Sequence, residues 1–487
     1  MSVSKSKRPW RKPGGRYPRV SRALLFFAAG LVSLGILLIY PSRARMDGPR
    51  VYAIKDAQIV TGSGKTISKG TVVFRDGLII EVGENAKIPA DARVVDGSGL
   101  TVYPGLIDAF GAFGQPAPAA PPAGAGLGGN RQAAAARLLA QAPETADQVH
   151  GDPSASAADQ FKPDMAGLEA ARFDGITAEL ISPPQGIFAG QASLINLAPA
   201  EVSKMVVRSP VALTVQFATS RGFGGVYPVS LMGSVAFIRQ TFYDAIHYRD
   251  EVNRQEHAKR GVERAEYDKK LAALQPVIKG DVPVIFVANT DTDIHRALMI
   301  ADEFKLKPII QGAVDGYRAA DILGSRKIPV ILSVDFPKRQ ADLPDDVDEP
   351  LRVLRERADA PKCAARLSAA GVKLAFSSGK LKPDDFIANV RKAVESGLGK
   401  DAALRALTIG AAEILGAADQ LGTIEKGKIA NLTVVSGDLL AKDSKVRHLF
   451  IDGDEVELKK PETPARRPEG MGQRPGDDTD DADRRRL

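Results

Sequence analysis

The five histidines are the first candidates for metal chemistry, because neutral imidazole is a common ligand for zinc and other divalent ions. A catalytic zinc site needs about three protein ligands, and two of these usually stand at a short fixed spacing on one strand or helix. No two histidines show such a spacing. We therefore expect each to be a surface or helix-capping residue: His150, His247, His257, His295 and His448.

Nucleophile and phosphate motifs are also missing from the sequence. Cys363 is the only cysteine, which excludes an internal disulfide and a cysteine-based zinc cluster. It lies in a predicted helix with no histidine nearby in sequence, so a buried apolar role is favoured over a nucleophile. The chain has neither a Gly-Lys-Ser/Thr phosphate loop nor a Gly-x-Ser-x-Gly elbow.

Polar residues near the ends of predicted strands are a second group of candidate functional residues. Six of them could line a pocket: Asp108, Asn289, Asp291, Gln311, Asp335 and Ser378. With Glu179, their oxygens could hold Mg²⁺ or Ca²⁺, although we do not favour such a site. The plainer alternatives are that Asp108 caps the turn below its strand and that Asp335 caps the loop before Pro337.

The elements that must position these residues alternate between Val/Ile-rich strands and helices. Strands are predicted at 177–181, 211–215, 282–287, 307–310, 328–332 and 372–376, and helices at 293–304, 317–323 and 384–397. Continuous apolar strands with crossover helices are typical of a parallel sheet covered on both faces. We favour a (β/α)8 TIM-like barrel over residues 103–417, with an open doubly wound sheet as the alternative.

Two β-rich segments bracket this barrel. Asp76-Gly77 between apolar runs predicts a hairpin, and similar patterns recur near the other end. We expect residues 51–102 and 418–458 to form one composite small β-sandwich domain. We also expect a low-complexity loop at 115–160, a charged, solvated helical insertion at 243–274 and a disordered tail at 461–487.

Two segments resemble the metal-dependent amidohydrolases. Residues 100–109, LTVYPGLIDA, resemble the strand that opens their barrel, and residues 406–432 resemble their closing helix, turn and strand. The likeness spans most of 51–453 and is closest to the imidazolonepropionase-like branch. It implies an α/β barrel, hydrolysis of carbon–nitrogen bonds, and zinc or another divalent metal.

The positions that hold the metal in that family are occupied differently here. The first strand of active members ends in Asp-Ala-His-x-His, and Phe110 and Ala112 stand at the histidine positions. By the same resemblance, Val287 and Gln311 replace later histidines and Gly379 replaces an aspartate. Because phenylalanine and alanine offer no donor atom, we expect no metal, no other cofactor and no catalytic residue in this barrel.

The charge distribution sets the N-terminus apart. The chain has 66 Lys and Arg against 59 Asp and Glu, and the first 22 residues hold eight cations and no acid. The basic surplus therefore belongs to a leader, and nucleic acid is not an expected partner. The uncharged run 23–40 predicts a transmembrane helix behind a cytoplasmic leader at 1–22. A signal peptide that is cleaved for secretion is the alternative.

Three functions fit these features. We favour a single-pass protein of the cytoplasmic (inner) membrane, with a periplasmic barrel that acts as a non-catalytic subunit, a pseudoenzyme, beside a homologous active amidohydrolase. The second is an active hydrolase of non-peptide amide, cyclic amide or peptide-derived bonds with an atypical metal site. The third is a binding module for a small molecule or peptide. Fold alone does not choose among them.

Overall fold

The computed structural model describes residues 50–113, 145–220, 225–257, 261, 266–339, 346–379 and 381–460. The expected leader, the expected membrane anchor, most of the low-complexity loop and the tail fall outside these ranges. Within them, no helix has the length and apolar character needed to cross a membrane. The last part of the expected 115–160 loop carries two short helices, α3 (Ala146–His150) and α4 (Ala157–Gln160), which corrects that expectation.

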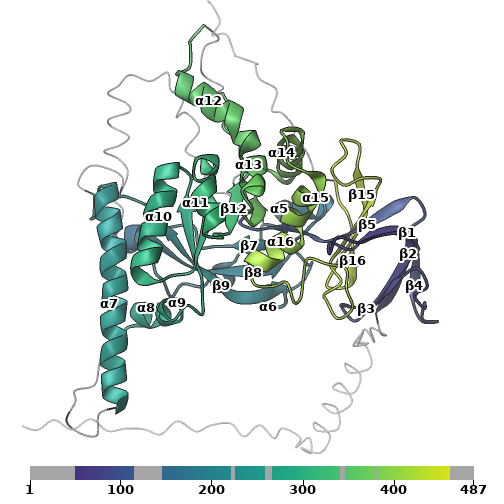
Figure 1. Cartoon of the computed structure of the whole chain (residues 1–487). Helices are drawn as coiled ribbons and strands as arrows, with labels where there is room; N and C mark the ends of the chain where they lie inside the picture. The colour runs from purple at the N-terminus through teal and green to yellow at the C-terminus, as the bar shows by residue number, and fades with distance from the viewer. Residues whose placement is uncertain are drawn as a thin grey trace, which may run out of the picture. The chain divides into compact units, whose positions relative to one another are not determined.

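Eight strands form a nearly closed barrel in the centre of the described chain (Figure 1). They are hydrogen-bonded in chain order: β6 (Leu106–Asp108), β7 (Ile176–Ile181), β8 (Phe188–Asn196), β9 (Val206–Gln216), β10 (Val284–Ala288), β11 (Pro308–Gly312), β12 (Val330–Ser333) and β13 (Leu374–Ser377). The first and last strands meet where Ala109 N donates to Phe376 O at 2.9 Å. The fold is therefore mixed α/β with a TIM-like barrel.

One strand breaks the expected strand–helix alternation. β8 is antiparallel to both of its neighbours, β7 and β9. The connection before it, residues 182–187, contains Pro183, Pro184 and Gly186, and it is too short for the crossover that a parallel neighbour needs. The expectation of eight parallel βα units is wrong at this point, and the other seven strands run the same way.

Most helices lie around the outside of the barrel, whereas α12 (Leu351–Asp359) buries no side chain and stands away from the barrel (Figure 1). Their bounds are α5 (Met165–Phe173), α6 (Val202–Met205), α7 (Leu231–His257), α8 (Lys269–Ala273), α9 (Gln275–Ile278), α10 (Asp291–Phe304), η1 (Gly316–Arg318), α11 (Ala320–Ser325), α12 (Leu351–Asp359), η2 (Ala360–Lys362), α13 (Cys363–Ala369), α14 (Pro383–Glu395), α15 (Lys400–Leu407) and α16 (Ile409–Ile414). The helices predicted at 293–304 and 384–397 are present with shifted ends, and the one predicted at 317–323 is divided into the 3-10 turn η1 and the α-helix α11.

The described parts of the expected insertion at 243–274 include the second half of a longer helix, α7, and their side chains are mostly exposed or partly buried. α7 begins at Leu231 and buries Ile238, Phe242 and Ala245. The Phe242 ring lies 5.6 Å from Phe188 of β8 and 5.1 Å from Phe304 of α10, measured between ring centroids. Ile238 and Phe242 precede residue 243, so the part of α7 that packs against the barrel lies mainly before the expected insertion.

The remaining strands share one sheet, in the order β16-β15-β14-β5-β1-β2-β3, with β4 paired to β1. Their bounds are β1 (Val51–Val60), β2 (Thr66–Arg75), β3 (Leu78–Gly83), β4 (Arg93–Asp96), β5 (Leu100–Pro104), β14 (Leu432–Ser436), β15 (Lys445–Ile451) and β16 (Asp454–Val456). The antiparallel β5–β14 pair joins the two ends of the described chain. Asp76 and Gly77, at φ 49° and 87°, form the predicted turn between β2 and β3.

This sheet folds over its own core, so a single sheet supplies both layers of the expected sandwich. The Phe450 ring of β15 lies 5.5 Å from Tyr52 of β1 and 5.0 Å from Phe74 of β2, although β14 and β5 separate these strands in the sheet. Amides then tie the sheet to the barrel. Asn431 Nδ2 donates to Asn196 Oδ1 at 2.8 Å, and Asp452 N donates to Asn431 Oδ1 at 2.9 Å.

Candidate functional site

The carboxyl ends of the parallel strands are where catalytic residues collect in barrels of this type. The barrel interior is packed with aliphatic side chains, including Ile285, Ile309, Ile331 and Ala375. Because successive side chains alternate between the two faces of a strand, the residues two positions later face the same interior at the strand ends. Those residues are Val287, Gln311, Ser333 and Ser377.

Phe110 completes this end of the barrel. Its side chain is partly buried and packs against the interior aliphatic cluster. Ser377 Oγ donates to Phe110 O at 2.5 Å, which fixes the segment that follows β6 against the end of β13. We call Phe110, Val287, Gln311, Ser333 and Ser377 the strand-end ring.

The strand-end ring does not fit a divalent metal ion. It offers one amide and two hydroxyls, beside an aromatic and an aliphatic side chain that cannot coordinate. Of the other positions at which the resemblance expects ligands, Ala112 is exposed and Gly379 has no side chain. Over the described ranges, no group of three or more His, Cys, Asp or Glu side chains is arranged to hold a metal.

Asp108 lies on the other face of the β6 wall and is fully buried beside Glu179 of β7. The two residues are register partners. A Cβ built on Gly111 would lie 2.1 Å from Asp108 Oδ2 and 2.5 Å from Glu179 Oε1, so both carboxyl groups converge on the bare α-carbon of this glycine. Glu179 Oε1 also accepts from Phe113 N at 2.8 Å.

Burial raises the pKa of Asp108 to about 6, against the lowering effect of its hydrogen bonds with Ser378 and the Phe110 amide. Asp108 Oδ1 accepts from Ser378 N at 3.1 Å and from Phe110 N at 3.2 Å, whereas Oδ2 is buried without a described hydrogen-bond partner. The Asp108 carboxyl therefore organises the backbone after β6 and β13. It caps the turns that follow these strands, at the opposite end of β6 from the turn below the strand that the plainer alternative named.

Of the other predicted pocket residues, Ser378 lies beside Asp108 and donates from its amide to Oδ1, and no hydrogen bond in the described ranges joins the remaining four to Asp108. Asn289 is exposed, and Asp291 starts α10 with its Oδ1 3.3 Å from His295 Nδ1. Asp335 is partly buried, and its amide donates to Ser333 Oγ at 3.3 Å. A Cβ on Gly379 would lie 3.7 Å from the Asp335 Cβ, so these two positions are neighbours.

The five histidines and the cysteine make packing and hydrogen-bond contacts, and those of His150 reach residues far away in the sequence. His150 stacks on Phe237 at 4.2 Å, and its Nε2 lies 2.8 Å from Tyr227 O. His247, His257, His295 and His448 contact residues of their own helix or hairpin. Cys363 is buried, and burial raises the pKa of its thiol to about 12, which favours the apolar role.

Sequence reasoning missed Ser333 and Ser377 as members of the strand-end ring. It also missed that Glu179 pairs with Asp108. The signal for the serines was the strict alternation after Ile331 and Ala375, which places each serine on the interior face. The carboxyl pair had no comparable signal, because two acids on separate strands become neighbours only through the β6–β7 register.

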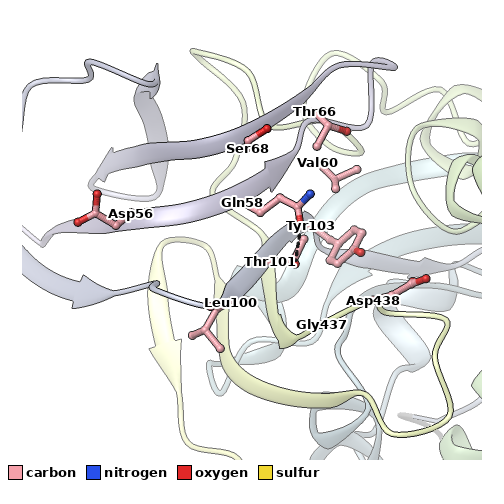
Figure 2. A pocket seen from close by; sticks show the side chains of 11 residues that line it. Asp56, Gln58, Val60, Thr66, Ser68, Leu100, Thr101, Tyr103, Gly437 and Asp438 are labelled. Atoms are coloured by element: carbon pink, nitrogen blue, oxygen red, sulfur yellow. Dashed lines mark hydrogen bonds between the residues drawn. The ribbon is translucent and has the colours of Figure 1, made fainter.

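Several hollows lie elsewhere on the described chain, with none of the strand-end ring residues in their walls. One hollow of about 520 Å³ faces the small sheet and is lined by hydroxyls and carboxylates, including Thr66, Ser68, Tyr103 and Asp438 (Figure 2). Thr101 Oγ1 donates to Gln58 Oε1 at 3.2 Å in its wall. Tyr103 precedes the first barrel strand, so this hollow lies at the opposite end of that strand from Phe110.

The fold therefore defines a protein with an α/β barrel and a small β domain built from both ends of the chain. The amidohydrolase family model matches residues 326–456. Over 56 residues the chain is 46% identical to the 5-methylthioadenosine/S-adenosylhomocysteine deaminase of Pyrococcus furiosus, a match that spans 12% of this chain and 13% of that enzyme.

Solved structures extend the likeness to most of the chain. An amidohydrolase from Thermotoga maritima is 26% identical with a TM-score of 0.68, over 84% of this chain and 100% of that one. A second amidohydrolase structure, 15% identical with a TM-score of 0.50 over 84% of this chain and 100% of its own, shows the shared fold alone. The chain belongs to the amidohydrolase superfamily.

Proposed function

We propose that this chain is a membrane-anchored, extracytoplasmic amidohydrolase-fold protein that forms no divalent metal centre and serves as a non-catalytic subunit of a homologous hydrolase. The observation that carries the proposal is Phe110. Its side chain stands at a position where active members have a metal-binding histidine, and it packs into the aliphatic interior.

The chemistry of the strand-end ring supports the loss of activity. Hydrolysis in this superfamily depends on a metal-bound water whose pKa is lowered far below that of bulk water. Val287 and Gln311 are register partners on β10 and β11, so the two later histidine positions of the resemblance are adjacent here and hold no imidazole. The buried Asp108 carboxyl is engaged by two backbone amides, which suits a structural role.

The membrane and partner parts of the proposal rest on the sequence. Eight cations in the first 22 residues precede the uncharged run 23–40, an order that favours a cytoplasmic N-terminus and an extracytoplasmic barrel. A barrel that keeps its fold but lacks metal ligands can still bind an intact homologue as a structural subunit.

Metal analysis tests the central claim. The full-length chain is purified in neutral detergent, incubated with Zn²⁺, Mn²⁺ or Fe²⁺, dialysed, and measured by inductively coupled plasma mass spectrometry. We expect far less than one ion per chain with each metal. One retained ion per chain would contradict the proposal, and Asp108→Ala and Asp335→Ala variants would show which carboxylate holds it.

Affinity purification from the native membrane tests the partner. We expect a second amidohydrolase-fold chain with an intact His-x-His motif to be recovered in a constant ratio. Recovery of this chain alone, together with chelator-sensitive amide hydrolysis by the pure protein, would support the active-hydrolase alternative instead. Resistance of the chain to extraction from membranes by alkaline carbonate separately tests the anchor.

A further inference from the structure

A hollow of about 550 Å³ lies where α5 and α14 of the barrel meet the segment that joins β14 to β15. We call it the basic groove, because five cationic side chains line it: Arg391, Lys442, Lys445, Arg447 and Lys460. Only two carboxyl groups, Asp174 and Asp384, stand in the same wall. The groove therefore carries a surplus of positive charge.

The five cations form no close ion pair with the described residues around them, although Arg391 is near enough to Asp174 to affect its charge. Within the part of the chain that the structure describes, none of them has a carboxylate oxygen within 4.0 Å. Arg391 Nε is buried without a hydrogen-bond partner among those residues. Cations just outside the groove are paired, since Lys459 Nζ lies 3.3 Å from Glu169 and Lys400 Nζ lies 2.8 Å from Asp438.

The two acidic side chains in the groove offset its positive charge only weakly. Burial, and then the charge of Asp384, raise the pKa of Asp174 to about 7, while Arg391 acts in the opposite direction. Asp384 is exposed at the start of α14. A concave wall with one dominant sign of charge concentrates the electrostatic field and attracts ions of the opposite sign.

We propose that the basic groove binds an organic anion that carries two or more phosphate charges. Guanidinium groups bind phosphate oxygens through paired hydrogen bonds, and lysines add mobile point charges. The hollow is in the ~300–1,000 Å³ range of small-molecule sites, and Phe173, Ile387 and Leu439 give it an apolar wall for the carbon part of the ligand. A soluble phosphate ester and a phospholipid headgroup share this chemistry.

Calorimetric titration tests the site with inorganic pyrophosphate as the probe. The full-length chain, in neutral detergent and at low salt, is expected to bind pyrophosphate at one saturable site. An Arg391→Gln/Arg447→Gln variant is expected to bind about tenfold more weakly or worse, which corresponds to ~1.4 kcal/mol. Lys459→Gln is the matched control, because Lys459 is ion-paired outside the groove, and it should keep wild-type affinity.

A second variant keeps the test decisive if the arginine variant does not fold. Lys442→Gln/Lys445→Gln removes two exposed side chains, and it should also weaken binding while leaving the far-ultraviolet circular dichroism spectrum unchanged. Absence of saturable binding, or equal affinity in the wild type and this variant, would overturn the proposal. The basic leader is present in every sample and so cannot produce a difference between them.

Vesicle binding then identifies the source of the phosphate. If the ligand is a lipid headgroup, the groove variants should bind phosphatidylglycerol vesicles less well than the wild type, with equal binding to phosphatidylcholine vesicles. If the ligand is a soluble phosphate ester, vesicle binding should be the same in all variants and only pyrophosphate affinity should fall. If the variants keep both pyrophosphate binding and vesicle binding at the wild-type level, the proposed site is refuted.

Discussion

Replacing Asp108 with asparagine should stabilise the protein at alkaline pH. Asp108 is fully buried, and its pKa is raised from 3.8 to about 6. In the folded state the carboxyl therefore holds its proton to a higher pH than it does in the unfolded chain. Wild-type stability should accordingly fall as the pH rises from about 4 to about 6, and should then stay low.

The structure sets the size of this effect. At ~1.4 kcal/mol for each tenfold change in proton affinity, the difference between 3.8 and about 6 corresponds to roughly 3 kcal/mol. Asparagine keeps an oxygen that can accept from Ser378 N and Phe110 N, and its amide group can donate toward Glu179. Because asparagine does not ionise, Asp108→Asn avoids the cost of burying a charge.

Urea unfolding of the full-length wild type and of Asp108→Asn at pH 4 and pH 8, followed by far-ultraviolet circular dichroism, measures the difference. We expect the variant to gain about 2–3 kcal/mol relative to the wild type between pH 4 and pH 8. Asp443→Asn, at an exposed position, is the control and should show no such gain. A difference between Asp108→Asn and the wild type that does not change with pH would refute the argument.

Three further changes test the described packing. Gly111→Ala places a methyl group against two buried carboxyls and should cost about 1–3 kcal/mol in urea unfolding, whereas Gly399→Ala, which has open space around it, should be nearly neutral. Phe242→Ala should cost about 3–5 kcal/mol, because its ring packs against Phe188 and Phe304, and a loss below about 1 kcal/mol would contradict this packing. Cys363 should resist iodoacetamide in the folded protein and react in urea; rapid labelling of the folded chain would contradict its burial.

The sequence predicted the strands of the barrel where burial is complete on both faces. The apolar runs that became β10 to β13 are continuous, so their type did not depend on tertiary contacts. The strand β8 was not predicted, and its antiparallel direction follows from the short connection before it. The first half of α7 was not predicted, and it carries Ile238 and Phe242, which pack against the barrel ahead of the charged segment that the sequence indicated.

For the candidate site too, some features could be predicted from the sequence and others could not. The loss of ligand-type residues at Phe110 and Ala112 is visible in the sequence, because the motif around them is otherwise close to that of the family. The pairing of Asp108 with Glu179 and the basic groove depend on the register of β6 with β7 and on the approach of α14 to the β14–β15 segment. Neither follows from spacing along the chain.

The β5–β14 pair also determines how late in synthesis the small sheet can be completed. β5 is complete at Pro104, but its partner begins at Leu432, so a chain made from the N-terminus must produce more than three hundred residues before the pair can form. Until then β5 presents an unpaired edge, the kind of surface that recruits other strands and promotes aggregation. A ribosome stalled before Leu432, or a protease that removes the last three strands, would therefore release a chain that cannot complete this sheet, even if its barrel strands are all present.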